Sequence, residues 1–122
     1  MPDQWNQRYS NLLGVIPQND GEGCLQDVHW SEGLFGYFPS YLMGHLISAQ
    51  LSEAMQQAIG PLEEHVSHGN EHQLLAWLRE HVHPIGRMMN AEQLVEQVTG
   101  KPLSSKPFLD YLEDKLERLR EL

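Results

Sequence analysis

The 122-residue sequence is poor in several features that would indicate particular classes of protein. Its one cysteine, Cys24, excludes an intrachain disulfide or a cysteine zinc site, and is expected to be a small buried apolar residue in a cytoplasmic protein. Basic residues number 8 against 17 acidic ones, and the net charge of −9 argues against nucleic acid or an anionic membrane as a partner. No apolar run approaches the roughly 18 residues that a membrane span needs. The composition therefore predicts a soluble globular protein.

The zinc-binding sequence His-Glu-x-x-His is also missing, because no histidine in the chain is followed by glutamate. His65, His68 and His72 would share one face of an unbroken helix and so suggest a metal site. Gly69 and Asn70, however, indicate a break between two helices within this group. We therefore favour solvated or capping histidines over a self-contained metal hydrolase.

Apolar spacing and capping residues predict an all-α chain. Asp3 as N-cap and Gly14 as stop should bound the first helix, and Pro39 and Gly60 should bound the second. The second helix, residues 39–59, is apolar on two neighbouring faces, so we expect it to be buried on more than one side. The remaining helix starts are placed at capping residues: Asn70, Asn90 with its capping-box partner Gln93 and its stop Gly100, and Ser104 or Ser105.

The stretch from residue 14 to 38 has five glycines and no sustained periodicity. A loop of this length is uncommon inside a compact domain and is usually functional. Residues 24–30, CLQDVHW, alternate enough to predict one short strand, in which Asp27 and His29 would share a side. Asp27 could then hold a ring N–H of His29, while Tyr37 and Tyr41, four residues apart, could present two phenols on one face.

Imidazole and phenol groups together can stabilise an oxyanion through hydrogen bonds. No strong nucleophile accompanies them, and the chain offers no Ser-His-Asp or Cys-His spacing. A packed aromatic core that contains a hydrogen-bonded histidine explains the same residues, and residue chemistry alone favours that explanation.

Two motifs in this stretch carry a resemblance to a known family. GCLQDVHW, residues 23–30, matches a Gly-x-x-Gln-Asp-x-His-Trp signature, and FGYFPSYLMG, residues 35–44, contains a Gly-Tyr-Phe-Pro-(Ser/Thr)-Tyr-x-x-Gly block. With further agreement through LLAWLREHVHPIGR and LVEQVTGKPLSSKPFLDYLEDK, the chain resembles the C-terminal part of the carboxypeptidase Taq family of zinc metallocarboxypeptidases over essentially its whole length.

The resemblance implies an all-α, saddle-like fold with a deep cleft, usually assembled as a homodimer. It implies release of single C-terminal amino acids from peptides by metal-activated water, with zinc or another divalent metal as cofactor. The family's metal ligands precede the part that this chain resembles. We therefore expect residues 1–122 to be a single all-α region of an incomplete domain, without metal ligands and inactive alone, with a homo-oligomer as its assembly.

The resemblance also implies roles for individual residues. His29 and Tyr41 would donate hydrogen bonds to the scissile carbonyl as it becomes tetrahedral, and Asp27 would orient His29. Gln26 and Tyr37 are weaker candidates for binding the substrate. The alternative is a small all-α interaction or peptide-binding module that reuses the carboxypeptidase C-terminus as a scaffold.

Overall fold

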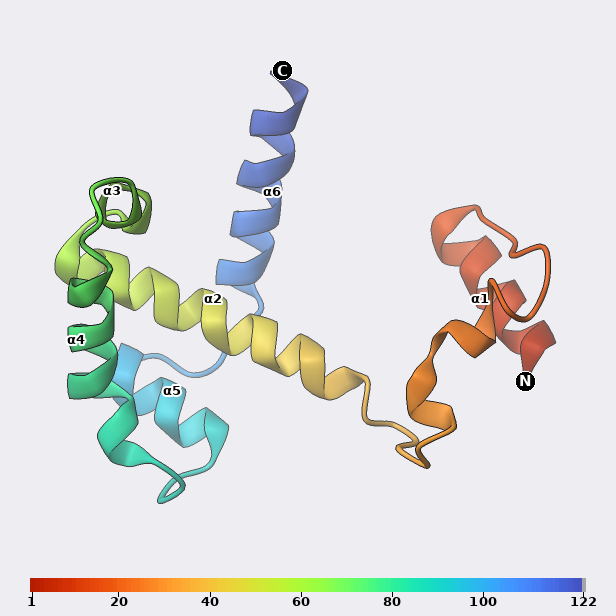
Figure 1. Ribbon diagram of the computed structural model, residues 1–122, viewed down its shortest axis with the longest axis horizontal. Coiled ribbons are helices and arrows are strands. Elements are labelled where there is room, and N and C mark those ends of the chain that lie inside the picture. Colours follow the sequence, from red (N-terminus) through yellow and green to blue (C-terminus); the bar gives the residue numbers. More distant parts are fainter. Residues whose placement is uncertain (122) are drawn as a thin grey trace. The chain divides into compact units, whose positions relative to one another are not determined.

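The computed structural model describes residues 1–121 of the chain, and it confirms the all-α class. Six α-helices and three short 3-10 helices account for all the regular structure within these residues, which contain no strand (Figure 1). The chain forms two compact units, an N-terminal unit of residues 1–40 and a C-terminal unit from Tyr41 onward.

The N-terminal unit begins with helix α1, Pro2–Leu13. The helix ends as expected at Gly14, whose φ of 70° lies in the left-handed region that glycine adopts most easily. The predicted N-cap is wrong, because Met1 occupies that position and Asp3 lies within the first helical turn. Pro2 explains the difference, since its fixed φ suits the first position of a helix and starts α1 earlier.

The short strand predicted over residues 24–30 is also wrong. Two 3-10 turns take its place, η1 (Cys24–Gln26) and η2 (Val28–Trp30). The Asp27 side chain accepts a hydrogen bond from the backbone N–H of His29 and so caps η2. Aspartate readily bonds to nearby backbone in this way, and here the local bond replaces an extended conformation.

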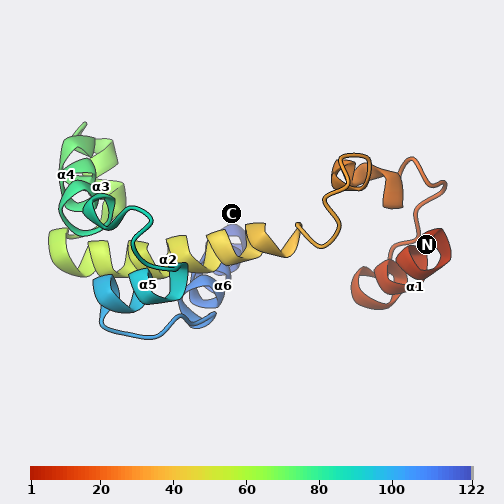
Figure 2. The same ribbon diagram turned by 90° about the horizontal axis from the view of Figure 1, so that it is seen from below.

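The C-terminal unit is built around α2, Pro39–Ile59, whose ends fall at the predicted Pro39 and Gly60. α3 and α4 lie at the C-terminal end of α2, and α5 runs beside α2. α6 begins beside α2 and points away from it (Figures 1 and 2). The other elements of this unit are α3 (Leu62–Ser67), α4 (Glu71–His81), η3 (His83–Ile85), α5 (Ala91–Thr99) and α6 (Lys106–Arg120).

Several predicted helix ends in this unit are confirmed. Asn90 and Gln93 form the complete capping box of α5, and Gly100 ends that helix in the left-handed conformation. Asn70 is the N-cap residue of α4, although its side chain makes no capping hydrogen bond. Ser105 is the N-cap residue of α6.

A small buried core holds the C-terminal unit together. Met55, Trp77, Ile85 and Val95 come from four different elements, and Val95 is fully buried. The core therefore joins α2, α4, η3 and α5 through side chains that are distant in sequence.

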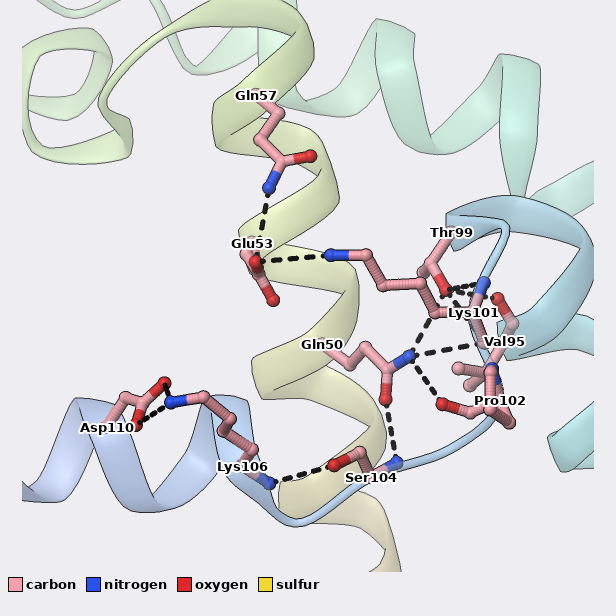
Figure 3. A network of polar contacts seen from close by, with 10 residues as sticks. All are labelled: Gln50, Glu53, Gln57, Val95, Thr99, Lys101, Pro102, Ser104, Lys106 and Asp110. Atoms are coloured by element: carbon pink, nitrogen blue, oxygen red, sulfur yellow. Dashed lines mark hydrogen bonds and ion pairs between the residues drawn. The ribbon is translucent and has the colours of Figure 1, made fainter.

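One polar side chain, Gln50, is buried with this core and is only 3% exposed. Its amide nitrogen donates to Thr99 Oγ1 at 3.2 Å and to the carbonyl oxygens of Lys101 at 3.3 Å and Pro102 at 3.0 Å. Its oxygen accepts from the backbone N–H of Ser104 at 3.0 Å (Figure 3). Gln50 therefore fixes the segment between α5 and α6 against the middle of α2.

Apolar side chains remain exposed on both long helices of this unit. Near the start of α2, Leu42 is 51% and Met43 39% exposed. Leu109, Leu116 and Leu119 are more than half exposed along α6. None of the described helices combines the length and apolar character of a membrane-spanning segment.

Candidate active site

The predicted pairing of Asp27 with His29 is present, on a different backbone from the one expected. His29 Nδ1 lies 2.6 Å from Asp27 Oδ1, and both side chains are mostly buried, with 16% and 14% of their surface exposed. The same carboxylate oxygen accepts from the backbone N–H of His29 at 3.0 Å. The capped 3-10 turn therefore fixes both the backbone conformation of His29 and the orientation of its ring.

The surroundings of Asp27 act on its pKa in opposite directions. Partial burial is the strongest single influence and raises the pKa. Hydrogen bonds from the His29 side chain and backbone, with the charge of His29 and a contribution from Trp30, outweigh burial and lower the pKa below its ordinary value of 3.8. Asp27 is therefore ionised near neutral pH and can only accept hydrogen bonds, so Nδ1 of His29 carries the proton between them.

Aromatic rings enclose the His29 imidazole. The Tyr37 ring stacks on it with centroids 5.6 Å apart and planes 24° apart. Phe38 meets it edge-on, also at 5.6 Å, with planes 86° apart. Rings in these arrangements attract each other and limit rotation of the imidazole. The ring of His29 is therefore held by one carboxylate and two aromatic neighbours.

The other predicted site residues are placed as follows. The side-chain amide of Gln26 donates to the backbone carbonyl of Gly21, within the same loop. Tyr37 is 45% exposed beside His29. Tyr41 is 50% exposed and belongs to the C-terminal unit, in the first turns of α2. Cys24 is buried, as predicted.

An aromatic column that the sequence did not reveal adjoins the His29 turn. We define it as Tyr9, Trp5, Trp30 and Phe35, in spatial order. Trp5 stacks on Tyr9 at 4.9 Å, its edge meets Trp30 at 6.4 Å, and Trp30 meets Phe35 at 5.9 Å. Trp5 and Trp30 are 25 positions apart, so no local periodicity could predict this contact.

The residues described here do not fit a metal site. No group of three or more His, Cys, Asp or Glu side chains within residues 1–121 is arranged to hold a metal ion. His65 Nε2 lies 2.7 Å from the carbonyl of Ile59, and His68 Nδ1 lies 2.7 Å from the carbonyl of Glu64. These two histidines bond to backbone carbonyls at helix ends, which agrees with their interpretation as capping residues.

Comparison with known proteins identifies the family to which the chain belongs. The family described as Carboxypeptidase Taq (M32) metallopeptidase matches residues 1–116. The chain is 42% identical over 119 residues to Thermostable carboxypeptidase 1 of Thermus thermophilus. This match covers 98% of this chain and 23% of that protein. It is 40% identical over 119 residues to Carboxypeptidase 1 of Bacillus subtilis, covering 98% of this chain and 24% of that one.

Solved structures agree with the sequence comparison. The crystal structure of an M32 carboxypeptidase from Deinococcus radiodurans R1 matches with a TM-score of 0.89 and 36% identity, covering 99% of this chain and 24% of that chain. The chain thus spans about a quarter of the length of the relatives it matches. From these matches, the chain belongs to the carboxypeptidase Taq (M32) family of metallopeptidases.

Proposed function

We propose that this chain contributes one wall of the substrate cleft in a metallocarboxypeptidase that releases single amino acids from peptide C-termini. The observation that carries the proposal is the 2.6 Å contact between Asp27 and His29, within a signature motif of a chain that belongs to this family. Ligands for the divalent metal, zinc in the family's usual form, are proposed to lie outside these residues. The chain alone would then be an incomplete domain without activity.

His29 and Tyr41 are the proposed catalytic hydrogen-bond donors. As the scissile carbonyl becomes tetrahedral, its oxygen gains negative charge, and donors aimed at that oxygen lower the barrier. Tyr41 can donate from its phenol O–H. Because Nδ1 of His29 donates to Asp27, the ring can donate to a substrate only from Nε2, and only when both ring nitrogens carry protons.

Asp27 has a supporting role in this proposal. Its ionised carboxylate holds the proton at Nδ1 and fixes the plane of the ring, so that a contact of the ring with the substrate would be made through Nε2. Tyr37, beside His29 and partly exposed, is the better placed of the two proposed substrate-binding residues. Gln26 would have to exchange its bond to Gly21 for one to the substrate.

A chimaera would test the proposal directly. The 119 residues of this chain that match would replace the corresponding segment of Bacillus subtilis Carboxypeptidase 1, and release of the C-terminal amino acid from a blocked dipeptide would be measured. The His29→Ala chimaera is expected to lose about 10²-fold or more in kcat, and Tyr41→Phe a similar factor, the usual loss on removing one oxyanion donor. Val28→Ala, an exposed neighbour in η2, is the matched control. An active His29→Ala chimaera with unchanged kcat would refute the donor role.

The isolated chain tests the claim of inactivity. We expect no stoichiometric bound zinc by elemental analysis and no release of amino acids from the blocked dipeptide. Activity that disappears with a chelator would contradict this claim. The apolar side chains exposed on α2 and α6 also support self-association, which sedimentation velocity would detect as a homo-oligomer. A cooperatively unfolding monomer would contradict that expectation.

A further inference from the structure

The N-terminal helix contacts the turn that carries His29 through one pair of rings. The Trp5 ring, on α1, meets the Trp30 ring, on η2, with centroids 6.4 Å apart and planes 66° apart. Trp5 also stacks on Tyr9 of the same helix. Trp30 is the residue directly after His29, so a contact that fixes Trp30 acts on the same 3-10 turn.

The geometry of a 3-10 turn couples these two side chains. With three residues per turn, consecutive side chains project about 120° apart. Trp30 therefore packs into the aromatic column while His29 projects toward Asp27, Tyr37 and Phe38. Rotation of η2 about its axis would move Trp30 out of the column and His29 away from its carboxylate together.

Ring packing holds the Trp5 indole against the turn. The indole nitrogens of Trp5 and Trp30 are both buried and make no hydrogen bond of ordinary geometry among the described residues, although the Trp30 side chain helps to lower the pKa of Asp27. Local hydrogen bonds support η2, such as Leu34 N–H to the His29 carbonyl at 2.9 Å and Ser31 Oγ to the Val28 carbonyl at 2.8 Å. These local bonds brace the turn internally but do not attach it to α1.

We propose that Trp5 is a positioning residue for His29. By packing against Trp30, Trp5 keeps the His29 ring oriented toward the Asp27 carboxylate. The proposal rests on the proposed function of His29 as a hydrogen-bond donor and assigns a second role within that site. Trp5 does not touch the reacting atoms. It acts through Trp30 on the orientation of η2. This role requires an aromatic side chain at position 5.

The proton between His29 Nδ1 and Asp27 Oδ1 gives a direct readout. A proton held over 2.6 Å between an imidazole and a carboxylate should give a separate downfield proton resonance that exchanges slowly with water. In the 122-residue chain labelled with ¹⁵N-histidine, this resonance reports the Asp27–His29 contact without any catalysis. Failure of the peptidase proposal would therefore leave this measurement unaffected.

The test compares Trp5→Ala, Trp5→Phe and the control Leu12→Ala, which removes an 80% exposed side chain from the same helix. We expect Trp5→Ala to raise the exchange rate of this proton at least about tenfold, or to abolish its resonance. Trp5→Phe should keep the rate within about threefold, and Leu12→Ala should not change it. A rate for Trp5→Ala equal to that of the unsubstituted chain would overturn the proposal.

A further variant covers the case in which Trp5→Ala unfolds the whole N-terminal unit. Trp5→Leu keeps an apolar side chain at this position but removes the ring, and the amide resonances of residues 15–26 would show that the loop is folded. In that folded variant we expect exchange to be at least about tenfold faster than in Trp5→Phe. Equal rates in Trp5→Leu and Trp5→Phe would refute the requirement for a ring.

Discussion

Short-range hydrogen bonds and one longer-range ring contact, between Trp5 and Trp30, help to order residues 1–40, whereas hydrogen bonds between distant residues help to order the chain from Tyr41 onward. In the N-terminal unit, bonds such as Gln26 to Gly21 and Leu34 to His29 join residues five apart. In the C-terminal unit, Gln50 bonds to residues 49 to 54 positions later. The first arrangement shapes a loop around one imidazole, and the second fixes helices around a common core. The difference teaches that the Asp27–His29 turn and the helical core depend on separate sets of contacts.

The largest expected effect comes from the core of the C-terminal unit. Trp77→Ala should lower the free energy of unfolding by about 3–5 kcal/mol, because Trp77 is only 6% exposed and its loss leaves a cavity. Urea denaturation followed by circular dichroism would measure this. Leu75→Ala, on the same helix but 40% exposed, should cost much less. If Trp77→Ala also abolished the Asp27–His29 proton resonance under folding conditions, the separation between the two units would fail.

A smaller but still large effect is expected at Gln50. Gln50→Leu should destabilise the C-terminal unit by about 2–4 kcal/mol, because it leaves the Pro102 carbonyl and the Ser104 N–H without their partner. The shift in the urea midpoint would measure it. Gln57→Leu is the control, since Gln57 is exposed and bonds only locally, to Glu53. Equal midpoints for the two variants would show that the long-range bonds add nothing.

The α5 cap should contribute less. Asn90→Ala removes the side chain that accepts from Gln93 N–H at 2.9 Å, and should cost about 1 kcal/mol of unfolding free energy. Asn90→Ser, which keeps an acceptor at this position, should recover most of the loss. Thermal or urea unfolding of both variants would check the order, and an unaffected Asn90→Ala variant would contradict it.

The smallest effect on stability is expected from acid acting on the N-terminal unit. The pKa of Asp27 is lowered in the folded chain, so its contribution to stability is present above the ordinary value of 3.8 and is lost as pH falls through the folded-state pKa. The His29 amide resonance, followed by NMR from pH 6 downward, should shift at that point. Asp27→Asn should remove this step, and Asp3→Asn should not. A step that persists in Asp27→Asn would assign it to another group.

Local signals allowed much of the fold to be predicted from the sequence. Pro39 and Gly60 bound α2, and Asn90 with Gln93 begins α5, because caps and stops act within a few residues. The 3-10 turns at residues 24–30 were missed because alternation suggested a strand, while the Asp27 side chain stabilised a turn instead. That side chain made the predicted contact with His29 nonetheless, because two residues so close can meet on either backbone.

Contacts between distant positions could not be predicted in the same way. The sequence gives no local sign that Gln50 reaches the segment after α5, since an isolated glutamine on an apolar helix has many possible partners. The meeting of Trp5 with Trp30 likewise depends on how the intervening loop folds back. Of the candidate site, the Asp27–His29 pair was therefore predictable, and the aromatic column behind it was not.

The position of Gln50 in the chain has a consequence for the order of folding. The groups that satisfy its side chain lie about 50 residues later, so they are synthesised only when the chain has nearly reached α6. Until then the Gln50 amide must stay hydrated, and α2 cannot bury that face. Closing so long a loop is entropically costly and slow. The docking of α2 against the segment before α6 is therefore a late event in folding, and a chain ending before Pro102 would lack the partners that complete it.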